Sequence, residues 1–169
     1  MATQEQKIEH LGDHLPYEVL MLRHTHNRMN SRIYPLDWNA FYEAFAVHAR
    51  ILLDFLENNS KSNGSNFNAS DFSAAFKARR DTEIARIVRQ EMNCQVLHFG
   101  KNRKSEPSAK VDLEKVNKVH AWVMDNFARF ISQLDADLKK HWYPDRANLK
   151  KRGEVAQLLA IQNQTNSTL

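Results

Sequence analysis

The amino-acid sequence predicts an all-α protein, an up-and-down bundle of four or five helices. Two observations carry this prediction. Residues 36–60 and 112–142 repeat apolar side chains at spacings of three and four, which line one face of an α-helix. The chain also holds only four glycines and four prolines in 169 residues, too few for the many turns of a β-sandwich or an α/β fold. We find no strand pair and no internal repeat.

The helix expected over residues 37–58 is central to the bundle. Asp37 is its predicted N-cap, because a carboxylate there can accept hydrogen bonds from free backbone N–H groups. The apolar stripe consists of Trp38, Phe41, Phe45, Ala49, Leu52 and Leu56. Ala44, Val47, Ile51 and Phe55 cover most of the remaining circumference. A helix this apolar needs neighbours on several sides, which predicts its central position.

The N-terminal part of the chain is expected to be simple. Residues 1–13 are polar and predict a flexible N-terminus. A first helix is expected from Leu15-Pro16, because Pro is favourable in a first helical turn. The apolar stripe of this helix runs through Val19 and Leu22 and includes His26.

Three further segments follow the central helix. An Asn- and Ser-rich loop is expected over residues 58–70, with Ser70 or Asp71 capping a short turn. A peripheral helix is predicted over residues 81–97, and the last long helix over residues 112–142, where a kink is compatible with its length.

The expected organisation is one helical-bundle domain over residues 14–145, with a partly disordered C-terminal tail over residues 146–169. A net charge of +4 is a mild bias toward polyanions. The single cysteine, Cys94, excludes an intramolecular disulfide framework and a multi-cysteine zinc site. No apolar run approaches the length of a membrane span. We expect a cytoplasmic protein with no membrane contact and no cofactor.

Eight histidines raise the question of a metal site. The stripes of the predicted helices would direct four of them inward, namely His26, His48, His120 and His141. Di-metal bundles, however, use Glu-x-x-His motifs, and none occurs in this sequence. We therefore favour hydrogen-bonded core histidines, and a metal-binding bundle is the lesser alternative.

A polar strip on the central helix supplies candidate interaction residues, Glu43, Arg50 and Asp54. Arg50 and Asp54 are spaced for an i,i+4 ion pair. The strip is either solvated or covered by another helix or a second subunit, and the sequence leaves both interpretations open. Basic clusters at residues 77–80, 101–104 and 150–152 have no interleaved aromatic residues, so solvated charge is favoured over a nucleic-acid groove.

Residues 43–56, EAFAVHARILLDFL, resemble the pattern E-x-F-x-I-H-A-R-x-L-x-D-F-[FL] of a group of small uncharacterised bacterial helical proteins. Asp71-Phe72 and Asn117-Lys118 stand where that group carries a D-F turn and an N-K element. The group is similar in architecture to HEPN domains, helical bundles of ribonucleases, toxins and abortive-infection proteins. The resemblance implies a HEPN-like fold. It covers the central helix well and about two thirds of the chain loosely.

Catalytic HEPN domains use an Arg-x(4–6)-His motif, and no arginine here has a histidine at that spacing. The leading hypothesis is therefore a non-enzymatic HEPN-like bundle, a homodimer that contacts RNA or a partner protein in bacterial stress or defence. The alternative is a divergent, metal-independent ribonuclease, with His48 or His120 as acid/base and Arg50 stabilising the phosphate.

Overall fold

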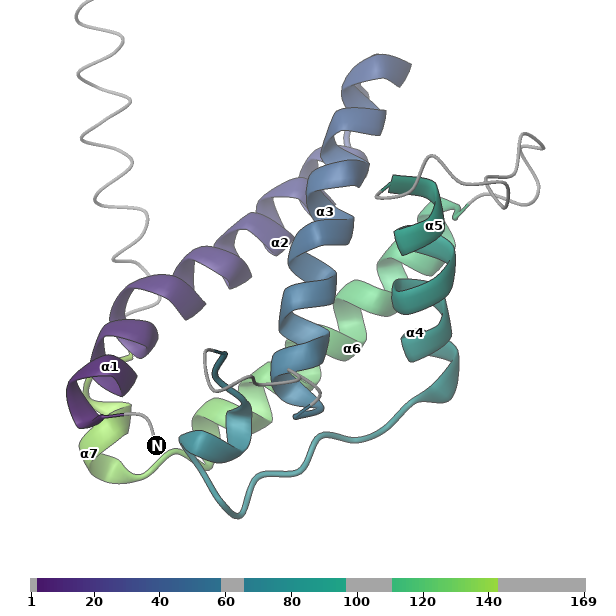
Figure 1. The fold of residues 1–169 in the computed structure, drawn as a ribbon. Helices are drawn as coiled ribbons and strands as arrows, with labels where there is room; N and C mark the ends of the chain where they lie inside the picture. The colour runs from purple at the N-terminus through teal and green to yellow at the C-terminus, as the bar shows by residue number, and fades with distance from the viewer. Residues whose placement is uncertain (1–2, 59–65, 97–110, 143–169) are drawn as a thin grey trace, which may run out of the picture.

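The computed structural model describes residues 3–58, 66–96 and 111–142 (Figure 1). Over these ranges every regular element is an α-, 3₁₀- or π-helix and no strand occurs, which confirms the all-α prediction. None of the helices in the described ranges combines the length and apolarity that a membrane span requires.

The first helix begins earlier than the sequence suggested. Helix α1 (Gln4–Glu9), a π-helical turn (His10–His14) and α2 (Leu15–Met29) follow one another without a break. Thr3 caps the start, since its hydroxyl accepts from the Gln6 backbone N–H and the Gln6 side chain accepts from the Thr3 N–H. Leu11 is fully buried, which ties this segment to the core. The expected flexible stretch 1–13 is therefore helical from Gln4 onward.

Helix α3 (Pro35–Leu56) is the central element, as predicted. It packs against α2, α6 and the π turn that follows α4. The predicted N-cap is wrong: Tyr34 occupies that position, Pro35 starts the helix, and Asp37 lies in the first turn. A carboxylate in the first turn still interacts favourably with the helix dipole.

An extended segment follows α3 and crosses the lower edge of the molecule in Figure 1. A 3₁₀ turn (Ala69–Asp71) begins it, with Asn68 as N-cap instead of Ser70 or Asp71. Hydrogen bonds then join the segment to α6 and to its C-cap, Gln133. Ser73 Oγ donates to the Gln133 carbonyl (2.9 Å), Trp122 Nε1 donates to the Arg79 carbonyl (2.9 Å), and the Arg79 N–H donates to Asn126 Oδ1 (2.7 Å).

The predicted peripheral helix is present as α4 (Thr82–Arg86), a π turn (Ile87–Met92) and α5 (Asn93–Val96) in succession. Asp81 caps it by accepting from two backbone N–H groups of the first turn. Leu97, the predicted last residue, lies outside the described residues.

The last predicted helix is divided in two. Helix α6 (Leu113–Ser132) is capped by Asp112, and α7 (Ala136–Lys139) follows a short break. The break allows the chain to turn back, so that the Trp142 ring lies 5.3 Å from the Phe127 ring of α6. The helix predicted to about residue 142 therefore ends at Ser132, and a break before α7 stands where its length allowed a kink.

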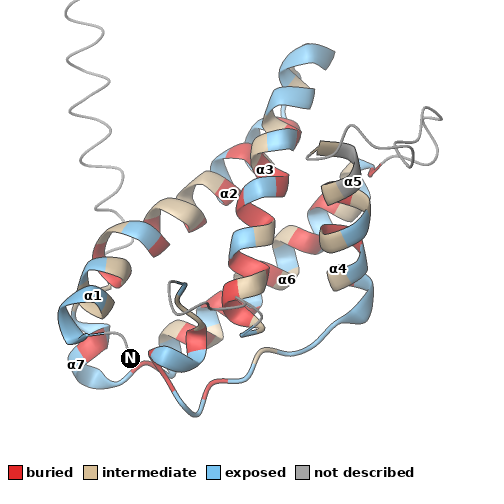
Figure 2. Cartoon of the chain, in the orientation of Figure 1, coloured by how far each residue is buried: buried red, intermediate tan, exposed pale blue. Residues whose placement is uncertain are grey.

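The core is a contiguous apolar cluster that faces the inside of every long helix (Figure 2). Its centre is Phe130 on α6, which is fully buried. Edge-on aromatic contacts bring Phe55, Phe72 and Phe76 to within 5.2–6.1 Å of it. Phe72 and Phe76 thus anchor the extended segment, in addition to the hydrogen bonds with α6.

Candidate functional sites

Two histidines from different helices form a stacked pair. His26 on α2 and His120 on α6 have ring centroids 3.7 Å apart and ring planes 5° from parallel. His26 Nε2 lies 2.8 Å from Asn117 Oδ1, which only accepts, so this nitrogen carries the proton. Asn30 Nδ2 donates to the same oxygen at 3.2 Å. We call these four residues, His26, Asn30, Asn117 and His120, the histidine cluster.

Within the histidine cluster, His120 is neutral at physiological pH. Burial, followed by the charges of His26 and Arg23, lowers the pKa of His120 to about 4. His26 Nδ1 and His120 Nε2 are buried and have no hydrogen-bond partner among the residues described. The cluster therefore contains two buried ring nitrogens whose hydrogen-bonding capacity is not used within the described part of the chain.

His48 forms a separate pair with α2. Its Nδ1 lies 2.6 Å from Glu18 Oε2, and the residue is 8% exposed. Tyr17 places its ring edge-on at 5.7 Å. His48 therefore lies on the core side of α3, as predicted. The carboxylate fixes the orientation of the imidazole and holds α2 against α3.

Arg50 belongs to an ion-pair network that joins α3 to the helix over residues 82–96. Arg50 Nε donates to Asp54 Oδ2 (2.5 Å), and Arg89 Nη2 donates to Asp54 Oδ1 (2.8 Å). The same Arg89 nitrogen lies 2.8 Å from Glu57 Oε2. We call these four residues, Arg50, Asp54, Glu57 and Arg89, the Arg89 network. Burial works against the charged form, but the hydrogen bonds that Arg89 donates to both carboxylates, and their negative charges, raise the pKa of Arg89.

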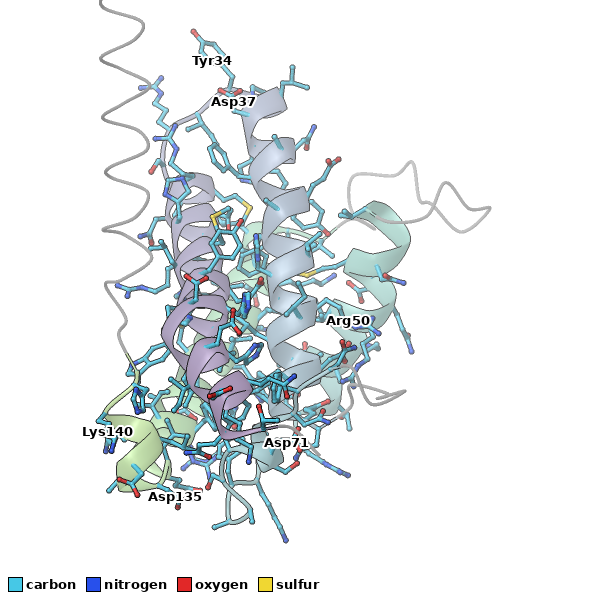
Figure 3. All side chains as sticks on the ribbon, turned by 60° about the vertical axis from the view of Figure 1, so that its left-hand side comes forward. Tyr34, Asp37, Arg50, Asp71, Asp135 and Lys140 are labelled. Atoms are coloured by element: carbon cyan, nitrogen blue, oxygen red, sulfur yellow. The ribbon has the colours of Figure 1, made fainter. Side chains whose placement is uncertain are left out.

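The polar strip of α3 is therefore divided between two environments. Arg89 covers Asp54, so this part of the strip is covered by another helix, which is one of the two interpretations that the sequence left open. Glu43 is exposed and lies outside the Arg89 network. In Figure 3, Arg50 lies on the side of α3 that faces the helix over residues 82–96.

The three candidate catalytic residues have separate partners. His48 contacts Glu18, Arg50 contacts Asp54, and His120 stacks on His26. All three lie in the described ranges, and no hydrogen bond or ion pair joins any two of them. His120 shares its site with His26 and Asn117. The helical spacing had predicted that both histidines face the bundle interior, but not that they stack or that Asn117 joins them.

A second ion-pair group lies between the π turn Ile87–Met92 and α6. Glu91 Oε2 accepts from Lys115 Nζ at 3.0 Å, and Glu91 Oε1 also accepts from Arg86. Burial acts to raise the pKa of Glu91, but these two cations hold it below its ordinary value. Burial and the nearby Glu91 charge raise the pKa of Tyr42.

The remaining candidates do not assemble into a site. Over the described ranges, no group of three or more His, Cys, Asp or Glu side chains is placed to hold a metal ion. The basic clusters at residues 101–104 and 150–152 lie outside those ranges. In the cluster at residues 77–80, Arg79 pairs with Asp125 at 3.4 Å. Lys77 and Arg80 line a cavity of about 360 Å³ beside the C-terminal end of α3.

Large apolar side chains are exposed along α3. The exposed fractions are 80% for Tyr34, 78% for Leu36, 37% for Val47 and 44% for Ile51. Tyr34 is at the projecting N-terminal end of the helix (Figure 3). The sequence pattern had assigned Val47 and Ile51 to faces that neighbouring helices cover, whereas the structure leaves both accessible.

The sequence patterns did not indicate several residues of these contacts, among them Glu18, Arg89 and Asn126. Asn126 is completely buried and bonds to the extended segment. Its position in the apolar repeat of α6, beside Phe127, is a signal that could have identified it as a buried polar residue. Glu18 and Arg89 carry no such signal, because single charges on a helix surface are common.

Comparisons with known proteins identify no relative: the chain matches no protein-family model, no curated protein and no solved structure.

Proposed function

We propose that this chain is a non-enzymatic helical protein of HEPN-like architecture that acts by binding a partner protein, in a bacterial stress or defence setting. The observation that carries the proposal is the exposed apolar surface of α3, formed by Leu36, Val47 and Ile51. Contiguous exposed apolar side chains on a folded protein are typical of interaction sites.

The ion pairs beside α3 favour a protein partner over RNA at this surface. Arg89 is engaged by two carboxylates, and Lys115 and Arg86 both pair with Glu91. A groove that follows an RNA backbone needs cations free to contact phosphates, with aromatic side chains on which bases can stack.

The proposal is tested by site-specific photo-crosslinking in a bacterial host. A photoreactive residue in place of Ile51 is expected to give a covalent adduct that protease destroys and RNase leaves intact. The same residue in place of Ala128, exposed on α6, is the matched control and should give no adduct. An adduct sensitive to RNase, or equal adducts from both positions, would contradict a protein-binding role for α3.

RNA binding provides the complementary measurement. Fluorescence anisotropy with a single-stranded RNA, at two salt concentrations, is expected to show weak binding that disappears as the salt rises. Tight binding that decreases steeply with salt would instead favour RNA as the partner.

A divergent ribonuclease is the second candidate function, and the histidine cluster is the observation that favours it. His120 has a pKa of about 4, and its Nε2 is buried with no hydrogen-bond partner in the described part of the chain. A neutral imidazole can accept a proton from an RNA 2′-OH, and a pKa of about 4 makes His120 a weak base at neutral pH. This function predicts RNA cleavage that His120→Ala abolishes and that His24→Ala, a change at an exposed histidine of α2, preserves.

A further inference from the structure

One face of α3 carries a row of small and apolar side chains. We call it the α3 ridge, and it comprises Leu36, Ala40, Ala44, Val47 and Ile51. These positions recur at spacings of three and four, so they lie on one side of the helix. The other sides of α3 contact α2, α6 and the π turn Ile87–Met92. The ridge is therefore the side of the central helix on which apolar groups remain accessible.

The order of side-chain sizes along the α3 ridge is self-complementary. Small side chains, Ala40 and Ala44, precede the larger Val47 and Ile51. When a second α3 runs antiparallel, Ala40 faces Ile51 of the second copy and Ala44 faces its Val47. Each large group then meets a small one, which is how well-packed helix pairs fill space. A parallel pair would place alanine on alanine and isoleucine on isoleucine.

The charges beside the ridge have the same symmetry. Glu43 and Arg50 lie one heptad apart on the same flank of the ridge. In antiparallel helix pairs the matching flanks face each other, so Glu43 of each copy lies beside Arg50 of the other. Glu43 is exposed, and the Arg50 side chain remains 36% exposed despite its bond to Asp54.

We infer that the α3 ridge is the contact between two copies of this chain, which pack antiparallel about a two-fold axis between residues 45 and 46. The inference rests on the proposed function and names its partner. The projecting end of α3, with Leu36, reaches the level of residue 55 in the second copy and extends the contact beyond the ridge centre.

The first test is the molar mass in solution, by light scattering and sedimentation over a concentration series. The natural chain is expected to be a dimer, and Ile51→Glu is expected to raise the dimer Kd about 100-fold, because each dimer buries two such charges. Ala128→Glu adds the same charge to an exposed site on α6 and should leave the dimer intact.

Glu43→Arg gives a second variant that leaves the apolar ridge unchanged. It replaces two attractive contacts per dimer with repulsive ones and should raise the dimer Kd about tenfold. Because Glu43 is exposed and outside the Arg89 network, the change should not affect folding, which far-UV circular dichroism checks. A natural chain that is monomeric throughout, or a dimer insensitive to both changes, would overturn the inference.

Disulfide trapping tests the register. In a Cys94→Ser background, the double variant Ala40→Cys, Ile51→Cys should form a covalent dimer on mild oxidation. The two cysteines of one chain are about 16 Å apart along the helix and cannot join to each other. Ala40→Cys alone should stay monomeric under denaturing conditions. A covalent dimer from that single variant would indicate parallel packing and would overturn the proposed geometry.

The photo-crosslinking experiment separates this inference from the proposed function. An adduct from position 51 with twice the mass of the chain supports pairing of two copies. An adduct with a different protein, together with a monomeric chain, would overturn self-pairing while leaving protein binding by α3 in place.

Discussion

The Arg89 network offers a quantitative test of how this fold holds its peripheral helix. Arg89 donates to Asp54 Oδ1 through Nε (3.1 Å) and Nη2 (2.8 Å), and Nη2 also pairs with Glu57. The perturbation is a double-mutant cycle with Arg89→Met, Asp54→Asn and the combined variant. Methionine keeps much of the apolar stem of arginine while removing the charge and the hydrogen-bond donors.

The expected size of the effect follows from exposure. Arg89 engages two carboxylates, and hydrogen bonds to charged groups contribute about 1.5–3 kcal/mol each. The Arg89 and Asp54 side chains are 25% and 23% exposed, so water screens part of that interaction. We expect Arg89→Met to lower the free energy of unfolding by about 2–3 kcal/mol. The coupling between the two positions should be about 1–2 kcal/mol, since part of the contribution of Arg89 is made through Glu57.

The assay is urea unfolding followed by circular dichroism, with the m-value held as a check on two-state behaviour. Arg80→Met, at an exposed arginine of the extended segment, is the matched control and should change stability little. Additive effects of Arg89→Met and Asp54→Asn, within about 0.3 kcal/mol, would refute the reasoning. The ion pair between the two helices would then not contribute to stability.

Three further predictions concern other contacts. Asn126→Ala removes a buried carboxamide that accepts a hydrogen bond from the Arg79 N–H, so it should lower the free energy of unfolding by about 2 kcal/mol. Amide hydrogen exchange in residues 72–81 should become faster, and unchanged exchange there would contradict the prediction. The pKa of His120 is about 4 in the folded chain against an ordinary 6.5, so the unfolded chain binds the proton first and stability should fall as pH drops from 6.5 through 4. His120→Gln should reduce that slope in urea titrations at several pH values, while an unchanged slope would refute the assignment. Thr3→Ala removes the N-cap of α1 and should lower the free energy of unfolding by about 1 kcal/mol. Amide hydrogen exchange in the first helical turn should become faster, and equal exchange in the variant and the natural chain would show that the cap is unimportant.

The fold was largely predictable because the long helices bury regular apolar stripes. The period of three and four identified α3 and α6, and the helix predicted from residue 81 is present as α4 and the turns that follow it. The start of α1 was missed because its signal is a polar capping box at Thr3. The end of α6 was missed because the apolar repeat continues through Leu138 across the break.

The candidate sites were predicted less well, and the reason is physical. Helical spacing assigns a residue to one side of its own helix but does not specify which residue of another helix faces it. His48 was correctly placed on the core side of α3, yet its partner Glu18 is on α2. The stack of His26 on His120 likewise depends on how α6 crosses α2, which no local pattern determines.

The two π-helical turns have a consequence for how this sequence can change over time. A π turn holds one more residue than the α-helical turn it replaces, as a single-residue insertion would produce. Deleting one residue from the turn His10–His14 would restore regular winding but rotate α1 by about 100° relative to α2. Leu11 and the flanking Ile8 would then lose their places in the core. Each π turn therefore marks a point where chain length is constrained, and we expect insertions or deletions to accumulate in the loops instead.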